Sequence, residues 1–229
     1  MQSGSTPPFS VMPAQDQATG QPRLVQVEHM ASFDPDSLTR AQQYKLLAGS
    51  VVPRPIALVT TLGIEGPNAA PFSFFNVLGV EPPMLMFSAG MRGELEKDTV
   101  RNLRGFPEMV IHLVDGPNAE RMNLCSGPYP PSVNEIELAG FEIAKSDVVG
   151  PPRIASCPVH FECALDRIIP FGAVPYSLVV ARVLRMHFRP DVVDAALHID
   201  LKALDPIGRV TGPGMYSRTS DTFSLPPLT

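Results

Sequence analysis

From Pro55 onward the sequence consists of short apolar, β-branched runs separated by turn residues, and this pattern constrains the fold more than any other feature. IALVTTL (56–62) is followed by the turn residues IEGPN, and AAPFSFFNVLGV (69–80) is apolar again up to the break at Pro82. β-Branched and aromatic runs bounded by Gly, Pro and Asn are typical of strands. The pattern predicts a β-hairpin made of these two runs.

Four more strand-like runs follow. MLMFSA (84–89) and MVIHLV (109–114) are short, whereas the stretches at 157–171 and 175–188 are long and are joined by only GAV. The two long stretches read as a second hairpin. Helical segments are few, no βαβ alternation occurs, and no GxGxxG motif marks a Rossmann site. We therefore expect a mainly β chain, an antiparallel barrel with helical insertions, rather than a doubly wound sheet.

Three segments interrupt the strands with helical patterns. Apolar residues recur at helical spacing between Asp34, which we expect to be the N-cap, and Gly49, which ends a helix of about three turns. DTVRNLRGF (98–106) predicts a short helix capped by Asp98. GPNAERMNLCS, which begins at Gly116, predicts another.

The net charge of −5 and the pI near 5.5 provide no broad basic field, so nucleic acid is not an expected partner. The longest uncharged apolar run, 168–181, contains two prolines and is shorter than the roughly 20 residues of a membrane span. We therefore expect a soluble protein.

Cys125, Cys157 and Cys163 form neither a CxxC motif nor a zinc pattern, which favours buried thiols in a reducing cytoplasm.

The first 30 residues are rich in Pro, Gln, Ser and Gly and lack the basic start and apolar stretch of a secretory signal. They cannot bury enough apolar surface to offset the entropy of ordering. We expect residues 1–30 to be a disordered or partner-wrapping extension. Residues 31–229 then form a single domain, which we expect to lie in the cytoplasm.

Four segments carry a family resemblance: SVVPRPIALVTT (50–61), GPNAAPFSFFNVLGVEPP (66–83), LEKDTVRNLRGF (95–106) and GRVTGPGMYSRTSDTF (208–223). In these segments the chain resembles the flavin reductase-like domain family, and nitrilotriacetate monooxygenase component B-like proteins in particular. The segments occur in the family's order and spacing. The resemblance implies an FMN-binding split barrel that is a homodimer, with each flavin near the subunit interface.

The segment SFFN is where we expect the flavin ring to lie. Neighbouring side chains of a strand point to opposite faces, so only one of the two phenylalanine rings can meet a flavin. Polar groups are needed beside it, because the carbonyl oxygens and nitrogens of a buried isoalloxazine require hydrogen-bond partners. The candidate ring contacts are Ser73, Phe74, Phe75 and Asn76, with Thr60 and Thr61 from the preceding strand. Alternatively, SFFN is an ordinary strand with one buried and one half-buried ring.

The FMN phosphate needs donors, and a helix N-terminus supplies free amides and a favourable dipole. In this sequence Lys97 would give the charge, Thr99 a hydroxyl and amides, and Asp98 would cap the helix without touching the phosphate. Further phosphate candidates are Ser88, Arg92 and Arg54. The alternatives are an ordinary capped surface helix and, for Arg54, an interface salt bridge.

The resemblance places GRVTGPGMYSR beside the flavin, reaching over from the partner subunit. Tyr216 would stack on the ring or donate to its edge, with interface packing as the alternative, and Arg218 would bind a nucleotide phosphate. His112 and His160 lie in strand patterns and read as structural. His198 is kept as the one active-site candidate, and no pair of histidines has metal-ligand spacing.

The absence of a catalytic triad or paired carboxylates in the sequence pattern fits chemistry that a cofactor supplies. The first hypothesis is an NAD(P)H:flavin oxidoreductase that takes electrons from NADH or NADPH onto FMN and passes reduced flavin to a flavin-dependent oxygenase. The second is an FMN-binding redox or scaffold protein without nicotinamide chemistry. A more distant third is an enzyme that resembles pyridoxamine phosphate oxidase.

Overall fold

The structure is a computed structural model that describes residues 30–225. Contacts divide the chain into a unit of residues 1–41 and a unit of residues 42–229, and the β structure belongs entirely to the second. The extension predicted over residues 1–30 lies outside the described residues apart from Met30, so the predicted domain boundary stays a prediction.

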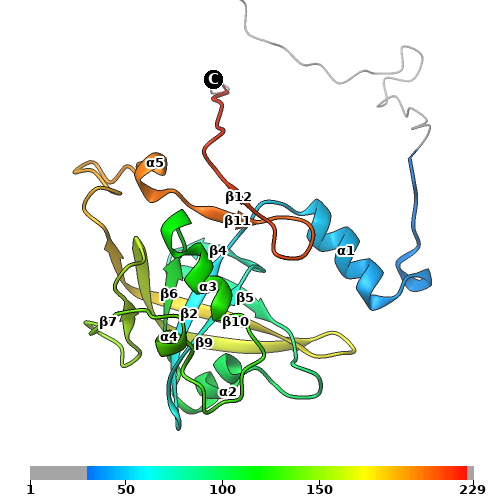
Figure 1. Cartoon of the computed structure of the whole chain (residues 1–229), viewed down its shortest axis with the longest axis horizontal. Helices are drawn as coiled ribbons and strands as arrows, with labels where there is room; N and C mark the ends of the chain where they lie inside the picture. The colour runs from blue at the N-terminus through cyan, green and yellow to red at the C-terminus, as the bar shows by residue number, and fades with distance from the viewer. Residues whose placement is uncertain (1–29, 226–229) are drawn as a thin grey trace, which may run out of the picture. The chain divides into compact units, whose positions relative to one another are not determined.

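A seven-stranded antiparallel sheet dominates the second unit (Figure 1). Its strands, in spatial order, are β3 (Gly66–Phe72), β2 (Ala57–Gly63), β6 (Glu108–Leu113), β9 (Val159–Phe171), β10 (Tyr176–Phe188), β5 (Pro83–Ala89) and β4 (Phe75–Val80). The end strands β3 and β4 are consecutive in the chain, and β3 also touches β5, where the rings of Phe72 and Phe87 lie 4.6 Å apart. The sheet therefore curves round on itself, with a seam at Ser73 and Phe74.

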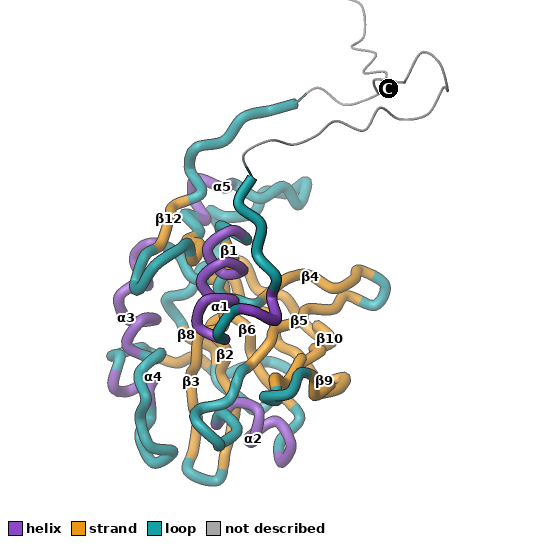
Figure 2. The backbone as a smooth tube through the Cα atoms, turned by 90° about the vertical axis from the view of Figure 1, so that its right-hand side faces the viewer, coloured by secondary structure: helices purple, strands orange, loops and turns teal. Residues whose placement is uncertain are grey.

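Two small sheets and several short helices complete the fold (Figure 2). One sheet contains β1 (Arg54–Pro55), β11 (Ile207–Arg209) and β12 (Tyr216–Arg218), and the other contains β7 (Ile143–Ala144) and β8 (Arg153–Ile154). The helices are α1 (Arg40–Ser50), α2 (Asp98–Gly105), α3 (Ala119–Leu124), α4 (Glu135–Leu138) and α5 (Leu201–Leu204), with 3₁₀ turns at Pro35–Ser37 and Gly116–Asn118. No helix among residues 30–225 combines the length and apolar character needed to cross a membrane.

Strand β2 of the main sheet is buried on both faces. Val59 packs inside the barrel with Phe75 and Phe87, whereas its neighbour Leu58 packs on the other face with Met122 of α3. This alternation follows from the two-residue period of a strand. Each fully buried side chain of this size contributes about 1.5–3 kcal/mol. The predicted antiparallel barrel with helical insertions is confirmed.

The long hairpin is also confirmed: β9 and β10 pair in antiparallel register from Phe171 opposite Tyr176 to Val159 opposite Phe188. The run 69–80, however, was predicted as one strand and is two. Phe72 pairs with Ala57 of β2, whereas Phe75 pairs with Phe87 of β5. The chain changes partner strand between these residues, which local strand propensity cannot reveal.

Both predicted N-caps are wrong. Asp34 caps the 3₁₀ turn, its carboxylate accepting from the amide of Asp36 at 3.0 Å, and α1 begins only at Arg40. Lys97, which has an extended backbone and no side-chain capping bond, occupies the N-cap of α2, and Asp98 is the first helical residue, with its carboxylate paired to Arg101 and Arg92. The predicted buried thiols are confirmed, and burial raises the pKa values of Cys125 and Cys163 to about 12.

Candidate functional site

Four of the predicted phosphate-site residues gather around the start of α2, which packs on β2 and β3, whereas Ser88 and Arg54 lie elsewhere. Arg92, Lys97, Asp98 and Thr99 line one small hollow, and the edge of β3 and the α3–α4 segment form its other walls. The remaining lining residues are Asn68, Ala70, Pro71, Cys125, Ser126, Gly127 and Glu135. The structure thus brings together residues that the sequence separates by up to 67 positions.

Lys97 is the cation of this hollow. Its ammonium lies 5.1 Å from the centre of the Phe72 ring, and no carboxylate of the described residues forms an ion pair with it. Burial, and then the charge of Arg92, lower its pKa. A half-buried ammonium without a counterion attracts an anion, and the neighbouring N-terminus of α2 adds to that attraction.

Asp98 brings a negative charge to the same place, but two arginines neutralise it. Its carboxylate forms a close ion pair with Arg101, and Arg92 Nη1 lies 3.6 Å from its second oxygen. Arg92 also donates to the carbonyl of Tyr129. Lys97 therefore has no competition from Asp98 for its charge, although Glu135 brings a second carboxylate to the lining.

Thr99 is almost fully buried, with 1% of its surface exposed. Its hydroxyl donates to Asn68 Oδ1 at 3.4 Å, and Asn68 Nδ2 donates to Glu135 Oε2 at 2.9 Å. An ionised carboxylate only accepts hydrogen bonds, so Glu135 fixes the orientation of the Asn68 amide. The Thr99 hydroxyl proton is used in the hydrogen bond to Asn68. The backbone amide of Thr99 is therefore the donor that we expect a ligand to use.

The two phenylalanines of SFFN have different environments. Phe75 is buried in the barrel core, whereas Phe74 is 36% exposed, so Phe74 is the ring that a ligand can reach. The guanidinium of Arg54 lies 5.9 Å from the centre of the Phe74 ring, and Tyr44 lies on the same ring at 6.3 Å. Arg54 does not line the hollow at α2. Asn76 is exposed, and its side chain accepts from the amide of Val77.

Two serines beside Phe74 have spare hydrogen-bonding capacity. The amide of Ser88 donates to the Phe74 carbonyl at 2.8 Å, but its buried Oγ has no partner among the described residues. Ser73 is half-buried, and within residues 30–225 its hydroxyl makes no hydrogen bond. Unpaired buried hydroxyls are costly, so Ser88 is a natural contact for a ligand group.

Thr60 and Thr61 are fully buried, and their hydroxyls are used within the chain. Thr60 donates to the Pro152 carbonyl at 2.7 Å, and Thr61 accepts from Asn102 at 3.1 Å. No contact of the described chain joins these two side chains to Ser73, Phe74 or Asn76, and their role at a flavin ring stays a prediction. Both threonines were predicted from the motif of the first strand, and in the structure they are buried in β2.

The C-terminal candidates make contacts within their own chain. The Tyr216 hydroxyl donates to Asn123 at 3.1 Å and accepts from Arg209 at 2.8 Å, and Arg218 forms an ion pair with Asp205. His198 lies on an exposed loop and pairs with Asp194 at 3.2 Å. None of these lines the hollow at α2.

The buried histidines are structural, as predicted. His112 Nδ1 donates to the Leu58 carbonyl, and its Nε2 accepts from the amide of Ile154. Burial lowers the pKa of His112 to about 3 and that of His160 to about 4. His160 Nε2 donates to the Cys157 carbonyl, and its Nδ1 has no partner in the described part of the chain.

One group of possible metal ligands occurs among residues 30–225: Asp147, Glu162 and His187. Arginines already occupy its carboxylates. Arg185 lies 3.2 Å from Asp147, and Arg153 lies 3.8 Å from Glu162. The group is therefore balanced in charge without a cation.

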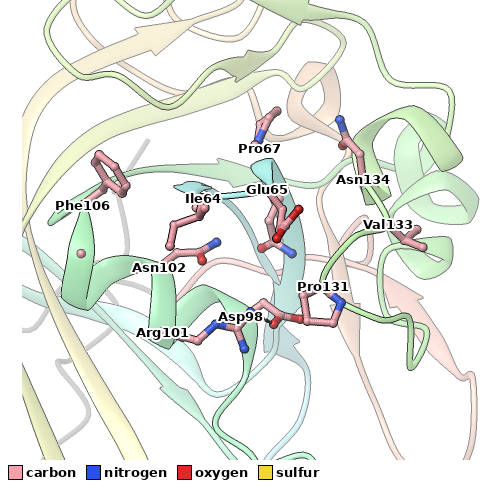
Figure 3. Close-up of a pocket in the computed structure, with 14 residues that line it drawn as sticks. Ile64, Glu65, Pro67, Asp98, Arg101, Asn102, Phe106, Pro131, Val133 and Asn134 are labelled. Atoms are coloured by element: carbon pink, nitrogen blue, oxygen red, sulfur yellow. Dashed lines mark hydrogen bonds and ion pairs between the residues drawn. The ribbon is translucent and has the colours of Figure 1, made fainter.

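A larger pocket of about 350 Å³ adjoins the hollow and shares Asn68 and Asp98 with it. Figure 3 shows it between the turn of the β2–β3 hairpin, the exposed side of α2 and the loop at Pro131. Sequence reasoning did not find Asn68 and Glu135, because a turn asparagine and a surface-helix glutamate give no signal of burial.

Comparisons with known proteins agree with this architecture. Residues 48–207 match the flavin reductase like domain. The crystal structure of nitrilotriacetate monooxygenase component B from Bacillus cereus is 34% identical, with a TM-score of 0.83 over 87% of this chain and 100% of that one. The 2-nitrobenzoate 2-nitroreductase NbaA of Pseudomonas fluorescens is 37% identical, with a TM-score of 0.79 over 87% and 97%.

A third solved structure, described as a flavin reductase with a split barrel domain from Shewanella frigidimarina, shares the fold. It is 18% identical, with a TM-score of 0.74 over 84% of this chain and 96% of that one. The expected split barrel is confirmed, and the seam at Ser73 and Phe74 is where this barrel opens.

Proposed function

Because this chain belongs to the flavin reductase-like domain family, we propose that it binds FMN and reduces it with NADH or NADPH. Bound FMN would supply the redox chemistry, accepting a hydride and passing its electrons on. The chain's own residues need only hold the ring and phosphate, position the nicotinamide and exclude water.

Lys97 is the observation that carries this proposal. It is a half-buried ammonium with no carboxylate partner among the described residues, and it stands at the N-cap of α2. A phosphate carrying nearly two negative charges fits this position, with Lys97 and the amides of Asp98 and Thr99 as donors. Arg92 lines the same hollow and offsets the charge of Asp98 there.

The isoalloxazine ring fits the seam beside Phe74. The Phe74 side chain is exposed at the point where the chain crosses between the two end strands of the sheet. The hydroxyls of Ser73 and Ser88 provide hydrogen bonds for ring oxygens and nitrogens, and Ser88 Oγ lacks any other partner in the described chain. Phe74 would also keep water from one face of the ring.

A homodimer fits the surface around this seam. The end strand β4 carries the exposed side chains Val77, Leu78 and Val80, with 60%, 49% and 82% of their surfaces accessible. Contiguous exposed apolar side chains on an edge strand mark an interaction surface. We propose that a second copy of the chain covers them and closes the flavin site.

The name of the Bacillus cereus structure identifies that protein as a component of a monooxygenase. We propose by analogy that reduced flavin from this chain supplies a flavin-dependent oxygenase. The three free buried thiols support a reducing location, the cytoplasm.

The identity of the flavin tests the first part of the proposal. The purified protein is denatured and the released flavin identified by chromatography, and the apoprotein is titrated with FMN and FAD. FMN should be recovered or bound in preference, since the anion site is built from a helix start and two cations. Exclusive recovery of FAD, or an apoprotein that does not bind FMN, counts against it.

A further inference from the structure

Two arginines face each other on neighbouring strands outside the hollow at α2. β1 pairs with β11 so that Arg54 lies directly opposite Arg209. Side chains in such a pair have their Cβ atoms about 4.5–5.5 Å apart, and like charges in this position destabilise a sheet. The pairing therefore has an energetic cost unless something negative compensates it.

Arg54 is 5% exposed and only partly satisfied. Its Nη1 donates to the carbonyls of Ala48 and Val51, at the C-terminal end of α1. These contacts explain why a guanidinium is tolerated there, since a helix C-terminus favours a cation. Its buried Nε, however, has no acceptor within the described chain.

Arg209 is half-buried, and its guanidinium contacts only uncharged groups of the described chain. Its Nη1 donates to the Tyr216 hydroxyl at 2.8 Å, its Nη2 lies 3.5 Å from the Gly212 carbonyl, and its guanidinium lies 4.8 Å from the Tyr216 ring. Neither Arg54 nor Arg209 forms an ion pair with a described residue. By contrast, Arg218 of the adjoining strand pairs with Asp205.

The arginine pair lies beside a reachable surface. Arg54 is 5.9 Å from the ring of Phe74, and Val51 and Met215 nearby in sequence are 64% and 55% exposed. A side chain at Gly49 would meet Thr211 Oγ1 at 3.2 Å, so the last turn of α1 lies against the loop that follows Arg209.

We propose that Arg54 and Arg209 form a second anion site, which takes the carboxylate or phosphate group of a small ligand that reaches Phe74. The guanidinium of Arg209 is accessible, and its planar donor fork matches either oxyanion. The site's role beside a flavin rests on the proposed function, whereas its binding of an oxyanion does not. A bound anion removes the repulsion across β1 and β11 and gives Arg54 Nε an acceptor.

Calorimetric titration of the full chain tests this site. Sodium benzoate is the carboxylate probe and sodium pyrophosphate the phosphate probe, both at constant ionic strength. The variant Arg209→Gln keeps the hydrogen bond to Tyr216 within reach but removes the charge, and Arg167→Gln is the control because that exposed arginine pairs with Asp166. Loss of one charge-assisted contact should weaken binding by about tenfold or more in Arg209→Gln.

The binding of the two probes to the two variants decides whether the arginine pair is an anion site. Saturable binding of either probe that weakens in Arg209→Gln but not in Arg167→Gln supports the site, and the tighter probe identifies the ligand group. Equal binding by the two variants, or no saturable binding by the wild type, overturns it. A fall from dimer to monomer in Arg209→Gln with unchanged anion binding also overturns it, since the pair would then serve the interface. A parallel FMN titration of the wild type reports on the proposed function independently.

Discussion

Among single residues, those whose polar groups lack a partner within the chain differ from those already hydrogen-bonded. Among the described residues Lys97 has no ion-pair partner and Ser88 Oγ has no hydrogen-bond partner, whereas the hydroxyls of Thr60, Thr61 and Thr99 each make a hydrogen bond within the chain. Burial without a partner is costly for a polar group, so the unsatisfied groups indicate where a ligand binds.

Replacing Lys97 with Ala should weaken FMN binding by about 1.5–3 kcal/mol, because one charge-assisted hydrogen bond to the phosphate is lost. Fluorescence titration of the apoprotein measures the change. Lys202→Ala is the control, since Lys202 lies exposed on α5. An unchanged dissociation constant in Lys97→Ala would remove this lysine from the site and point to Arg92.

Thr99→Val should separate the two roles of this residue. The backbone amide remains, so FMN affinity should stay within about twofold, whereas loss of the hydrogen bond to Asn68 should cost about 0.5–1.5 kcal/mol of folding stability. Urea unfolding and FMN titration measure the two effects. A large loss of FMN affinity at unchanged stability would mean that the hydroxyl binds the phosphate directly.

At the scale of elements, the sequence predicts what is local and misses what depends on a distant partner. The β9–β10 hairpin follows from two long strand patterns around GAV, and α2 follows from its periodicity. The break at Ser73 could not be predicted, because it arises where the chain moves from β2 to β5. The N-cap of α2 was missed because Lys97 makes no side-chain capping bond and so lacks the usual sequence signal of a cap, whereas Asp98 has that signal but pairs with Arg92 and Arg101.

In the candidate site, too, residues with a local sequence signature could be predicted and residues that depend on distant partners could not. Lys97 and Thr99 were found because a helix start has a sequence signature. Asn68, Glu135 and Arg209 were not, because their burial or pairing exists only once β3, α4 and β11 are in place.

His112 links strand β6 to strand β8 and gives this contact a pH dependence. Its folded pKa of about 3 lies below the unfolded value of about 6.5, so its stabilising contribution is complete above pH 6.5 and is lost as the pH falls toward 3. At pH 5 this histidine should cost about 2 kcal/mol of unfolding free energy relative to pH 7. Urea unfolding at both pH values measures the loss, and His112→Gln should reduce it. An equal loss in that variant would contradict the assignment.

At the scale of the whole molecule, the edge strand β4 and its exposed valines predict a dimer. Light scattering at micromolar concentration should give twice the mass of the 24.8 kDa chain. Val77→Asp should shift the mass toward the monomer, because a charge would be buried at the interface. Ile64→Asp is the control, since Ile64 is 98% exposed at the tip of the β2–β3 hairpin.

Deletion of residues 1–30 should leave FMN binding intact, since every residue proposed to bind the flavin lies between positions 73 and 99. Loss of both the dimer and flavin binding in the truncated chain would show that the extension belongs to the interface.

We propose that this barrel holds FMN at Lys97 and Phe74 and reduces it with a nicotinamide. Anaerobic addition of NADH or NADPH to the FMN-loaded protein, followed by visible spectroscopy, tests it most directly. The flavin absorption bands should bleach, and the faster of the two donors identifies the co-substrate. A spectrum that stays oxidised with both donors, while FMN remains bound, would contradict the reductase and leave an FMN-binding protein without nicotinamide chemistry.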